Sequence, residues 1–186
     1  MAEPETQQRP LIVGNDSKVE EPYPVKLKGS VTKGFGRGGK DLGIPTGKAV
    51  IFIVETLNPT TTKTSANLPE DVSQYAGQFI ETGILYGWAS ISDSSTVYPM
   101  VMSFGWNPFY KNEKRSAEVH IIHKFDHDFY GQELRVIVAG YIRAEKNYTS
   151  LDALIIDINF DIKVAHNSLL RKPYNDLQYD SFLQPK

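Results

Sequence analysis

The stretch VYPMVMSFGWNPFYKNEKRSAEVHIIHKF, residues 97–125, decides the fold. It holds two strand-like runs, 97–106 and 116–125, separated by the turn-rich piece WNPFYKN. Side chains of the second run alternate between two faces, as in a half-buried strand. One face carries Glu118, His120 and Ile122, and the other carries Ala117, Val119, Ile121 and His123.

The same strand pattern recurs on both sides of this stretch. Val25, Leu27, Gly29 and Val31 alternate with polar residues, and further strand-like runs lie at 83–91 and 133–142. Several short strands with no helix between them are typical of an antiparallel barrel or sandwich.

Only the C-terminal part has a helical period. Thr149 and Ser150 are both candidate N-caps, and Pro173 is expected to end the helix. Apolar residues three and four positions apart form its stripe: Leu151, Leu154, Ile155, Ile158, Ile162, Ala165 and Leu169. We interpret this stripe as a face that packs across the barrel.

Composition excludes several classes of protein. The 186 residues include 20 Lys+Arg and 22 Asp+Glu, a net charge of −2 that argues against a generally cationic nucleic-acid or membrane-surface binder. The absence of cysteine excludes disulfides, thiolate metal sites and cysteine nucleophiles, and it fits a reducing compartment. The N-terminus has neither a secretory nor an Arg-rich targeting pattern, and the longest apolar run, AVIFIV at 49–54, is too short to span a membrane. We therefore expect one cytoplasmic domain, with mitochondrial association as an open alternative.

The segment GFGRGGKD at 34–41 resembles several phosphate-binding loops but completes none of them. A dinucleotide fold needs a helix next, whereas LGIP follows, and Asp41 stands where a P-loop has Ser or Thr. Two interpretations are open: backbone N–H groups that approach an anion beside Arg37 and Lys40, or a flexible hairpin turn.

Glu118 beside His120 is likewise either a general base or part of a solvated strand face. We find no zinc-ligand spacing and no Ser–His–Asp set.

Taken together, these segments resemble riboflavin kinase of the eukaryotic type. The stretches that carry the resemblance are GFGRGGKDLGIPT (34–46), TGILYGWAS (82–90), SFGWNPFYKNEKRSAEVHIIHKF (103–125), DFYGQELRV (128–136) and GYIRAEKNYTSLDALI (140–155). The resemblance covers most of residues 9–170, and the lead-in is similar to fungal members. It implies a six-stranded antiparallel Greek-key β-barrel with a C-terminal α-helix packed against it, in an all-β-dominated fold.

The resemblance also implies a reaction. That family transfers the γ-phosphoryl group of ATP to the 5′-hydroxyl of riboflavin, giving FMN and ADP. By resemblance, Glu118 is the general base, and Arg143 and Lys146 match flavin-side positions. The positions that match the nucleotide site are Gly34, Lys40, Thr46, Ile121, His123 and Tyr130. The metal, Mg²⁺ or Zn²⁺, is held in that family by the Thr and Asn of a P-T-A-N sequence, here Thr46 and Asn67.

The P-T-A-N sequence is interrupted in this chain. Pro45-Thr46 is followed by GKAVIFIVETLNPTTTKTS at 47–65 and only then by Ala66-Asn67. Removing 47–65 leaves GIPTANLPED, so we hypothesise that this segment is a translated intron. The codons that its ends permit include a donor at Gly47-Lys48 and an acceptor at Ser65-Ala66. The alternative is a genuine insertion that loops out at the barrel rim.

The predicted organisation is an extended lead-in at 1–24, one riboflavin kinase domain at 25–172 and a tail at 173–186. We expect a monomer that binds ATP and riboflavin and neither nucleic acid nor membrane. The second functional reading is a flavin- or nucleotide-binding protein of the same fold whose turnover is impaired by the split metal site. The third functional hypothesis is a barrel that binds nucleic acid, which is suggested by the aromatic content and by the sequence WNPFYKNEKR.

Overall fold

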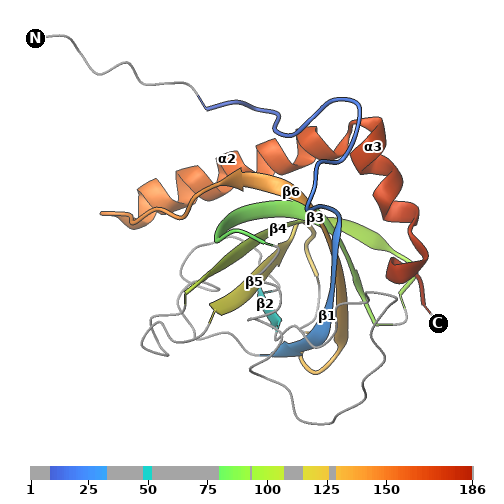
Figure 1. Cartoon of the computed structure of the whole chain (residues 1–186). Helices are drawn as coiled ribbons and strands as arrows, with labels where there is room; N and C mark the ends of the chain where they lie inside the picture. Colours follow the sequence, from blue (N-terminus) through green and yellow to red (C-terminus); the bar gives the residue numbers. More distant parts are fainter. Residues whose placement is uncertain are drawn as a thin grey trace, which may run out of the picture.

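The computed structural model describes residues 9–32, 48–51, 80–92, 94–106, 115–125 and 129–185. Its strands form one antiparallel sheet that curls into a barrel in the order β1-β2-β5-β4-β3-β6 (Figure 1). They are β1 (Val25–Thr32), β2 (Lys48–Ile51), β3 (Gly83–Ile91), β4 (Val97–Trp106), β5 (Arg115–Ile121) and β6 (Glu133–Arg143). The prediction of a mostly β, antiparallel fold with a C-terminal helix is confirmed.

Strands β3 and β6 are buried on both faces, and this splits the core in two. Leu85 and Ala89 of β3 belong to the cluster inside the barrel, together with Val136 and Val138 of β6. The alternate side chains belong to a second cluster outside the sheet: Tyr86, Trp88, Ile137 and Ala139. A period of two places successive residues on opposite faces, so each of these strands serves both clusters.

Helix α2 (Leu151–Leu169) covers the outer face of this part of the sheet (Figure 1). Ser150 is its N-cap and accepts a hydrogen bond from the backbone N–H of Ala153. The predicted stripe holds at its C-terminal end, where Ala165 and Leu169 are buried beside Asp161, Val164 and Ser168. At the other end Leu151 is 48% exposed. The helix therefore packs firmly only over its second half.

Pro173 does not end α2, so that prediction is wrong. The helix ends at Leu169, and Pro173 lies in the first turn of the next helix, α3 (Lys172–Asn175). A proline is tolerated there because its missing N–H would have no partner within the helix.

Both ends of the described chain pack onto α2 and the sheet. After α3, two short 3-10 turns follow, η2 (Asp176–Tyr179) and η3 (Ser181–Leu183), and Tyr174 and Leu183 are buried in the outer cluster. The indole Nε1 of Trp88 donates a hydrogen bond to the carbonyl of Tyr174 at 2.8 Å. In the segment before β1, the N–H of Val13 donates to Ser168 Oγ at 3.0 Å. Residues on both sides of the predicted domain limits thus contribute to the outer cluster.

Candidate active site

Glu118 lies on an outward-facing position of β5. Its neighbours Ala117 and Val119 are 2% and 1% exposed, whereas Glu118 itself is exposed. Its Cα partners are Ser103 on β4 and Val50 on β2. The alternation read from the sequence therefore directs this carboxylate away from the apolar interior, where a substrate can reach it.

A second carboxylate, Glu145, lies beside Glu118, and sequence reasoning missed it. Glu145 belongs to the segment between β6 and α2, yet its side chain reaches back over β4, where Ser103 Oγ donates a long hydrogen bond to Oε1 at 3.4 Å. Burial raises the pKa of Glu145, and the negative charge of Glu118 raises it further. The signal in the sequence is its place between Arg143 and Lys146, two positions that the family resemblance predicts to lie on the flavin side.

Gly105 makes room for Glu145. A Cβ built on Gly105 would overlap both carboxylate oxygens of Glu145 and would lie 2.5 Å from its Cδ. Any larger residue at this position of β4 would therefore displace the carboxylate. The next residue, Trp106, ends β4 and is 48% exposed.

Arg143 is held by α2 and by its own loop. Its guanidinium donates to Asp161 and to the hydroxyl of Tyr148, the latter at 2.8 Å, and its Nη1 donates to the carbonyl of Ala144 at 3.0 Å. Burial opposes the charge, but hydrogen bonding to Asp161 and the charge of that carboxylate raise the pKa of Arg143. All three guanidinium nitrogens are thus engaged in ordering the segment that carries Glu145.

Asp157, one turn before Asp161 on α2, completes this network. It accepts hydrogen bonds from Tyr148 at 2.9 Å and from Lys146 at 3.2 Å, and it pairs with Arg9 at 3.0 Å. Partial burial opposes the charge, but the hydrogen bonds from Tyr148 and Lys146 lower the pKa of Asp157. The two predicted flavin-side residues, Arg143 and Lys146, therefore belong to one ionic cluster, and Tyr148 and Asp157 are members that the sequence did not reveal.

The predicted nucleotide-side residues are divided between core and surface. Ile121 is fully buried in the barrel interior, whereas His123 is exposed and Tyr130 is 48% exposed. His123 stacks near Tyr98, with ring centroids 4.6 Å apart, and near Phe125 at 4.8 Å. These rings form an aromatic surface just beyond the end of β5.

The remaining predicted site residues, Gly34, Lys40, Thr46 and Asn67, lie outside the described residues, as do Arg37 and Asp41. Within the described ranges, no three His, Asp or Glu side chains are grouped so as to hold a metal ion. Among the helices that the structure describes, none is long and apolar enough to cross a membrane.

Comparisons with known proteins identify the class of enzyme. The flavokinase family model, described as riboflavin kinase, matches residues 21–169. A riboflavin kinase of Pyricularia oryzae is 48% identical over 182 residues, covering 89% of this chain and 81% of that protein. A riboflavin kinase of Mus musculus is 46% identical over 161 residues, covering 87% and 91%. The crystal structure of riboflavin kinase from Trypanosoma brucei shares the fold, with a TM-score of 0.64 at 24% identity over 90% of this chain and 94% of that one.

The family model and these curated relatives define a kinase, an enzyme that transfers a phosphoryl group. The chain belongs to the riboflavin kinase family.

Proposed function

We propose that this chain transfers the γ-phosphoryl group of ATP to the 5′-hydroxyl of riboflavin, with Glu118 as the general base. The proton of the 5′-hydroxyl passes to Glu118, the 5′-oxygen bonds to the γ-phosphorus, and the bond from that phosphorus to the β–γ bridging oxygen breaks. The products are FMN and ADP. The observation that carries this proposal is the exposed carboxylate of Glu118 on a strand whose flanking side chains are buried, beside the segment from Arg143 to Tyr148.

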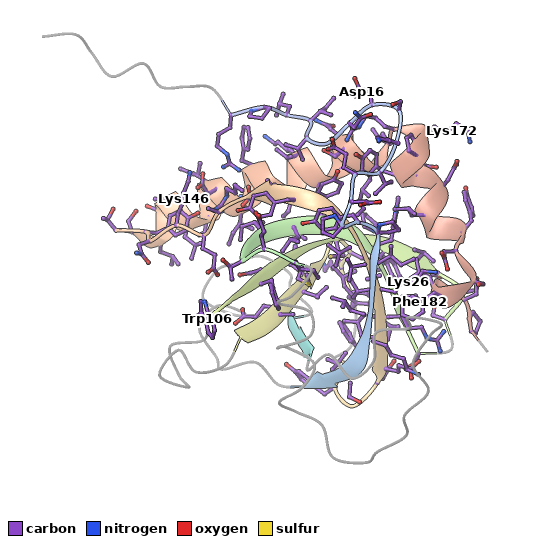
Figure 2. The ribbon with its side chains drawn as sticks, viewed as in Figure 1. Asp16, Lys26, Trp106, Lys146, Lys172 and Phe182 are labelled. Carbon is purple, nitrogen blue, oxygen red and sulfur yellow. The ribbon has the colours of Figure 1, made fainter. Side chains whose placement is uncertain are left out.

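The riboflavin side is assigned to the end of the barrel that carries Lys146 and Trp106. Both lie at the left of the molecule in Figure 2, toward the N-terminal half of α2. In the N-terminal half of α2, two apolar side chains are exposed, Leu151 at 48% and Ile156 at 68%. A flat, largely apolar isoalloxazine ring suits such a surface. Arg143 holds the loop on the riboflavin side in place through its hydrogen bonds to Asp161. Lys146, whose side chain is 49% exposed, presents a positive charge to the riboflavin.

The nucleotide side is assigned to the opposite flank of Glu118. The rings of Tyr98, His123 and Phe125 supply an aromatic surface for the adenine, and the exposed Tyr130 lies beyond Phe129. Ile121, fully buried, forms the wall behind these rings. The loop with Gly34 and Lys40 would cover the phosphates through its backbone N–H groups and its positive charge.

The metal is assigned as Mg²⁺, with Thr46 and Asn67 as its protein ligands. A threonine hydroxyl and an asparagine amide offer oxygen donors, which Mg²⁺ prefers, while Zn²⁺ prefers histidine and cysteine. Mg²⁺ takes its other ligands from water and substrate phosphates, so a cluster of three carboxylates is not required. When bound, such a cation neutralises charge on the transferring phosphoryl group.

The segment 47–65 bears directly on that metal site. Residues 48–51, which lie inside it, form β2 and pair with β1 and β5, with Lys48 opposite His120 and Val50 opposite Glu118. If 47–65 were removed, Ala66 and Asn67 would follow Thr46 and take the positions of residues 47 and 48. We propose that 47–65 is a translated intron and that the form without it is the more active enzyme.

Two measurements test this point. Transcript reads across the codons of Thr46 and Asn67 should contain a junction that removes 57 nucleotides, which is three per residue of the 19-residue segment. FMN formation by the full chain and by the chain without 47–65 should differ in favour of the shorter one. Equal rates, or an unspliced transcript alone, would contradict the proposal.

The finer points of architecture are proposals as well. The order β6-β3-β4-β5 supports a Greek key, because three consecutive strands are followed by one that returns beside the first. We assign residues 25–172 as the kinase domain, with 1–24 as a lead-in and 173–186 as a tail. We also propose that the chain is a monomer in the cytoplasm. Light scattering of the purified chain, and its location in fractionated cells, test these two assignments.

The central experiment is a direct assay of FMN formed from ATP and riboflavin. Glu118→Gln should lower kcat by roughly 10²- to 10⁴-fold, because the base is removed while the shape is kept. Riboflavin binding, followed by quenching of flavin fluorescence, should be little changed. Binding of riboflavin by the native chain without any ATP consumption would instead favour the alternative, a flavin- or nucleotide-binding protein with impaired turnover.

A further inference from the structure

We infer that Glu145 is a positioning residue for riboflavin, accepting hydrogen bonds from hydroxyl groups of the ribityl chain beside Glu118. This inference rests on the proposed function. It concerns a residue that neither the sequence motifs nor the proposed proton transfer uses.

The first support is the path of the side chain. Glu145 follows β6 in the chain, but it crosses β4 and meets Ser103, the residue that pairs with Glu118. Two carboxylates from distant parts of the chain therefore flank one serine. Such a convergence at an exposed strand face is not needed to hold the barrel together, because none of these side chains belongs to either core cluster.

The second support is the fit between Glu145 and Gly105. The carboxylate lies where a Cβ on residue 105 would be, so the strand offers space that only glycine leaves. Glycine is otherwise disfavoured in a strand, and its presence often marks a close approach of another group.

The third support is how the loop is held. Arg143 and Lys146, on either side of Glu145, are tied to Asp161 and Asp157 on α2. With its flanking residues anchored in this way, the loop can hold the carboxylate of Glu145 in place. Among the described residues, the one hydrogen bond that Glu145 accepts comes from Ser103 and is long, which leaves acceptor capacity on both oxygens.

The carboxylate of Glu145 is a hydrogen-bond acceptor, and this determines which part of riboflavin it can bind. Two carboxylates side by side repel each other and attract donors, and a polyol presents several O–H donors in a row. If the 5′-hydroxyl lies at Glu118, the neighbouring hydroxyls of the same chain come within reach of Glu145. A hydrogen bond to a charged acceptor also discriminates against analogues that lack the hydroxyl, because the carboxylate is then left without its donor.

The test compares Glu145→Gln with the native chain in steady-state FMN formation. The KM for riboflavin should rise roughly ten- to hundredfold, the range expected for one hydrogen bond to a charged acceptor, while the KM for ATP changes little. Glu20→Gln removes an exposed carboxylate of the segment before β1 and serves as the matched control, with native constants. Equal KM values for riboflavin in Glu145→Gln and the native chain would overturn the inference.

A substrate series identifies the contact. Of three riboflavin analogues that lack the hydroxyl at C2′, C3′ or C4′, at least one should be a poorer substrate of the native chain, yet lose nothing further in Glu145→Gln. If every analogue loses the same additional factor in the variant, Glu145 does not touch the ribityl chain and the inference is wrong. Absence of FMN formation both by the full chain and by the chain without 47–65 would instead defeat the proposed function itself.

Gly105→Ala gives an independent variant that keeps the carboxylate. The three atoms nearest to the added methyl group all belong to the flexible end of Glu145, so the fold should be retained, as thermal unfolding can verify. Gly105→Ala should raise the KM for riboflavin as Glu145→Gln does, and the double variant should be no worse than the worse single one. Additive effects in the double variant would contradict a shared mechanism.

Discussion

Arg143 donates three hydrogen bonds to Asp161: its Nε reaches both carboxylate oxygens at 3.1 Å, and Nη2 reaches Oδ2 at 2.6 Å. Asp161 is 2% exposed, and it also accepts a hydrogen bond from Arg9. One buried carboxylate thus joins the end of β6, the middle of α2 and the segment before β1. The loop that we propose for the flavin side begins at this junction.

Asp161→Asn should destabilise the fold by about 3 kcal/mol, because removal of one partner leaves buried positive charge uncompensated. Urea unfolding followed by circular dichroism measures the loss. Arg9→Gln is the matched comparison and should cost less, about 1 kcal/mol, since Arg9 is 24% exposed and its loss leaves Asp161 paired with Arg143. A loss for Asp161→Asn no larger than that for Arg9→Gln would contradict the central place of this carboxylate.

The pKa shift of Asp157 predicts how stability depends on pH. Its pKa is lowered from 3.8 in the folded state, so its contribution is present well above pH 3.8 and is lost as the pH falls through the lower, folded value. At pH 7 the native chain should be more stable than Asp157→Asn by about 1 kcal/mol. The difference should shrink toward zero as the pH falls below 3.8. Unfolding curves of both chains from pH 7 downward provide the check, and a difference that stays constant with pH would refute the assignment.

The tail after α2 should matter for stability. Leu183 is fully buried in the outer cluster, so Leu183→Ala should cost about 2–5 kcal/mol through lost apolar contact and the cavity left behind. Leu170→Ala makes the same change at a residue that is 63% exposed, and it should stay within about 0.5 kcal/mol of the native chain. Equal effects of the two variants in thermal unfolding would show that the tail does not contribute to the core.

The parts of the fold that the sequence predicted depend on interactions between residues close together in the chain. Alternation along 116–125 put Ala117, Val119 and Ile121 on one face, and all three are buried, because the period of a strand is a local property; His123, assigned to the same face, lies beyond the end of β5 and is exposed. Ser150 as the N-cap is local in the same way. The end of α2 was not predictable from Pro173, since a proline that cannot continue one helix can open the next.

The parts of the site that escaped prediction depend on distant contacts. Asp161 lies within an apparently apolar stripe, and only the approach of Arg143 and Arg9 explains a buried charge there. Apart from its place between Arg143 and Lys146, nothing in the sequence distinguishes Glu145 from other exposed glutamates. Its contact with Ser103 depends on the path that the segment between β6 and α2 takes over β4. A family resemblance supplied Glu118, Arg143 and Lys146, but it gave no geometry that would connect them.

Lys146→Ala should separate the two substrate sides. Lys146 is 49% exposed and shares Asp157 with Tyr148, so its loss should leave the fold within about 1 kcal/mol of native stability. On the proposed assignment it removes a cation from the riboflavin side alone, and the KM for riboflavin should rise roughly three- to tenfold while the KM for ATP stays native. Lys172→Ala is the control, because Lys172 is an exposed lysine that pairs with Asp176 and lies on α3, at the far end of α2 (Figure 2). A rise in the KM for ATP in Lys146→Ala, with riboflavin unaffected, would place the flavin elsewhere, because a cation that contacts the nucleotide cannot mark the flavin side.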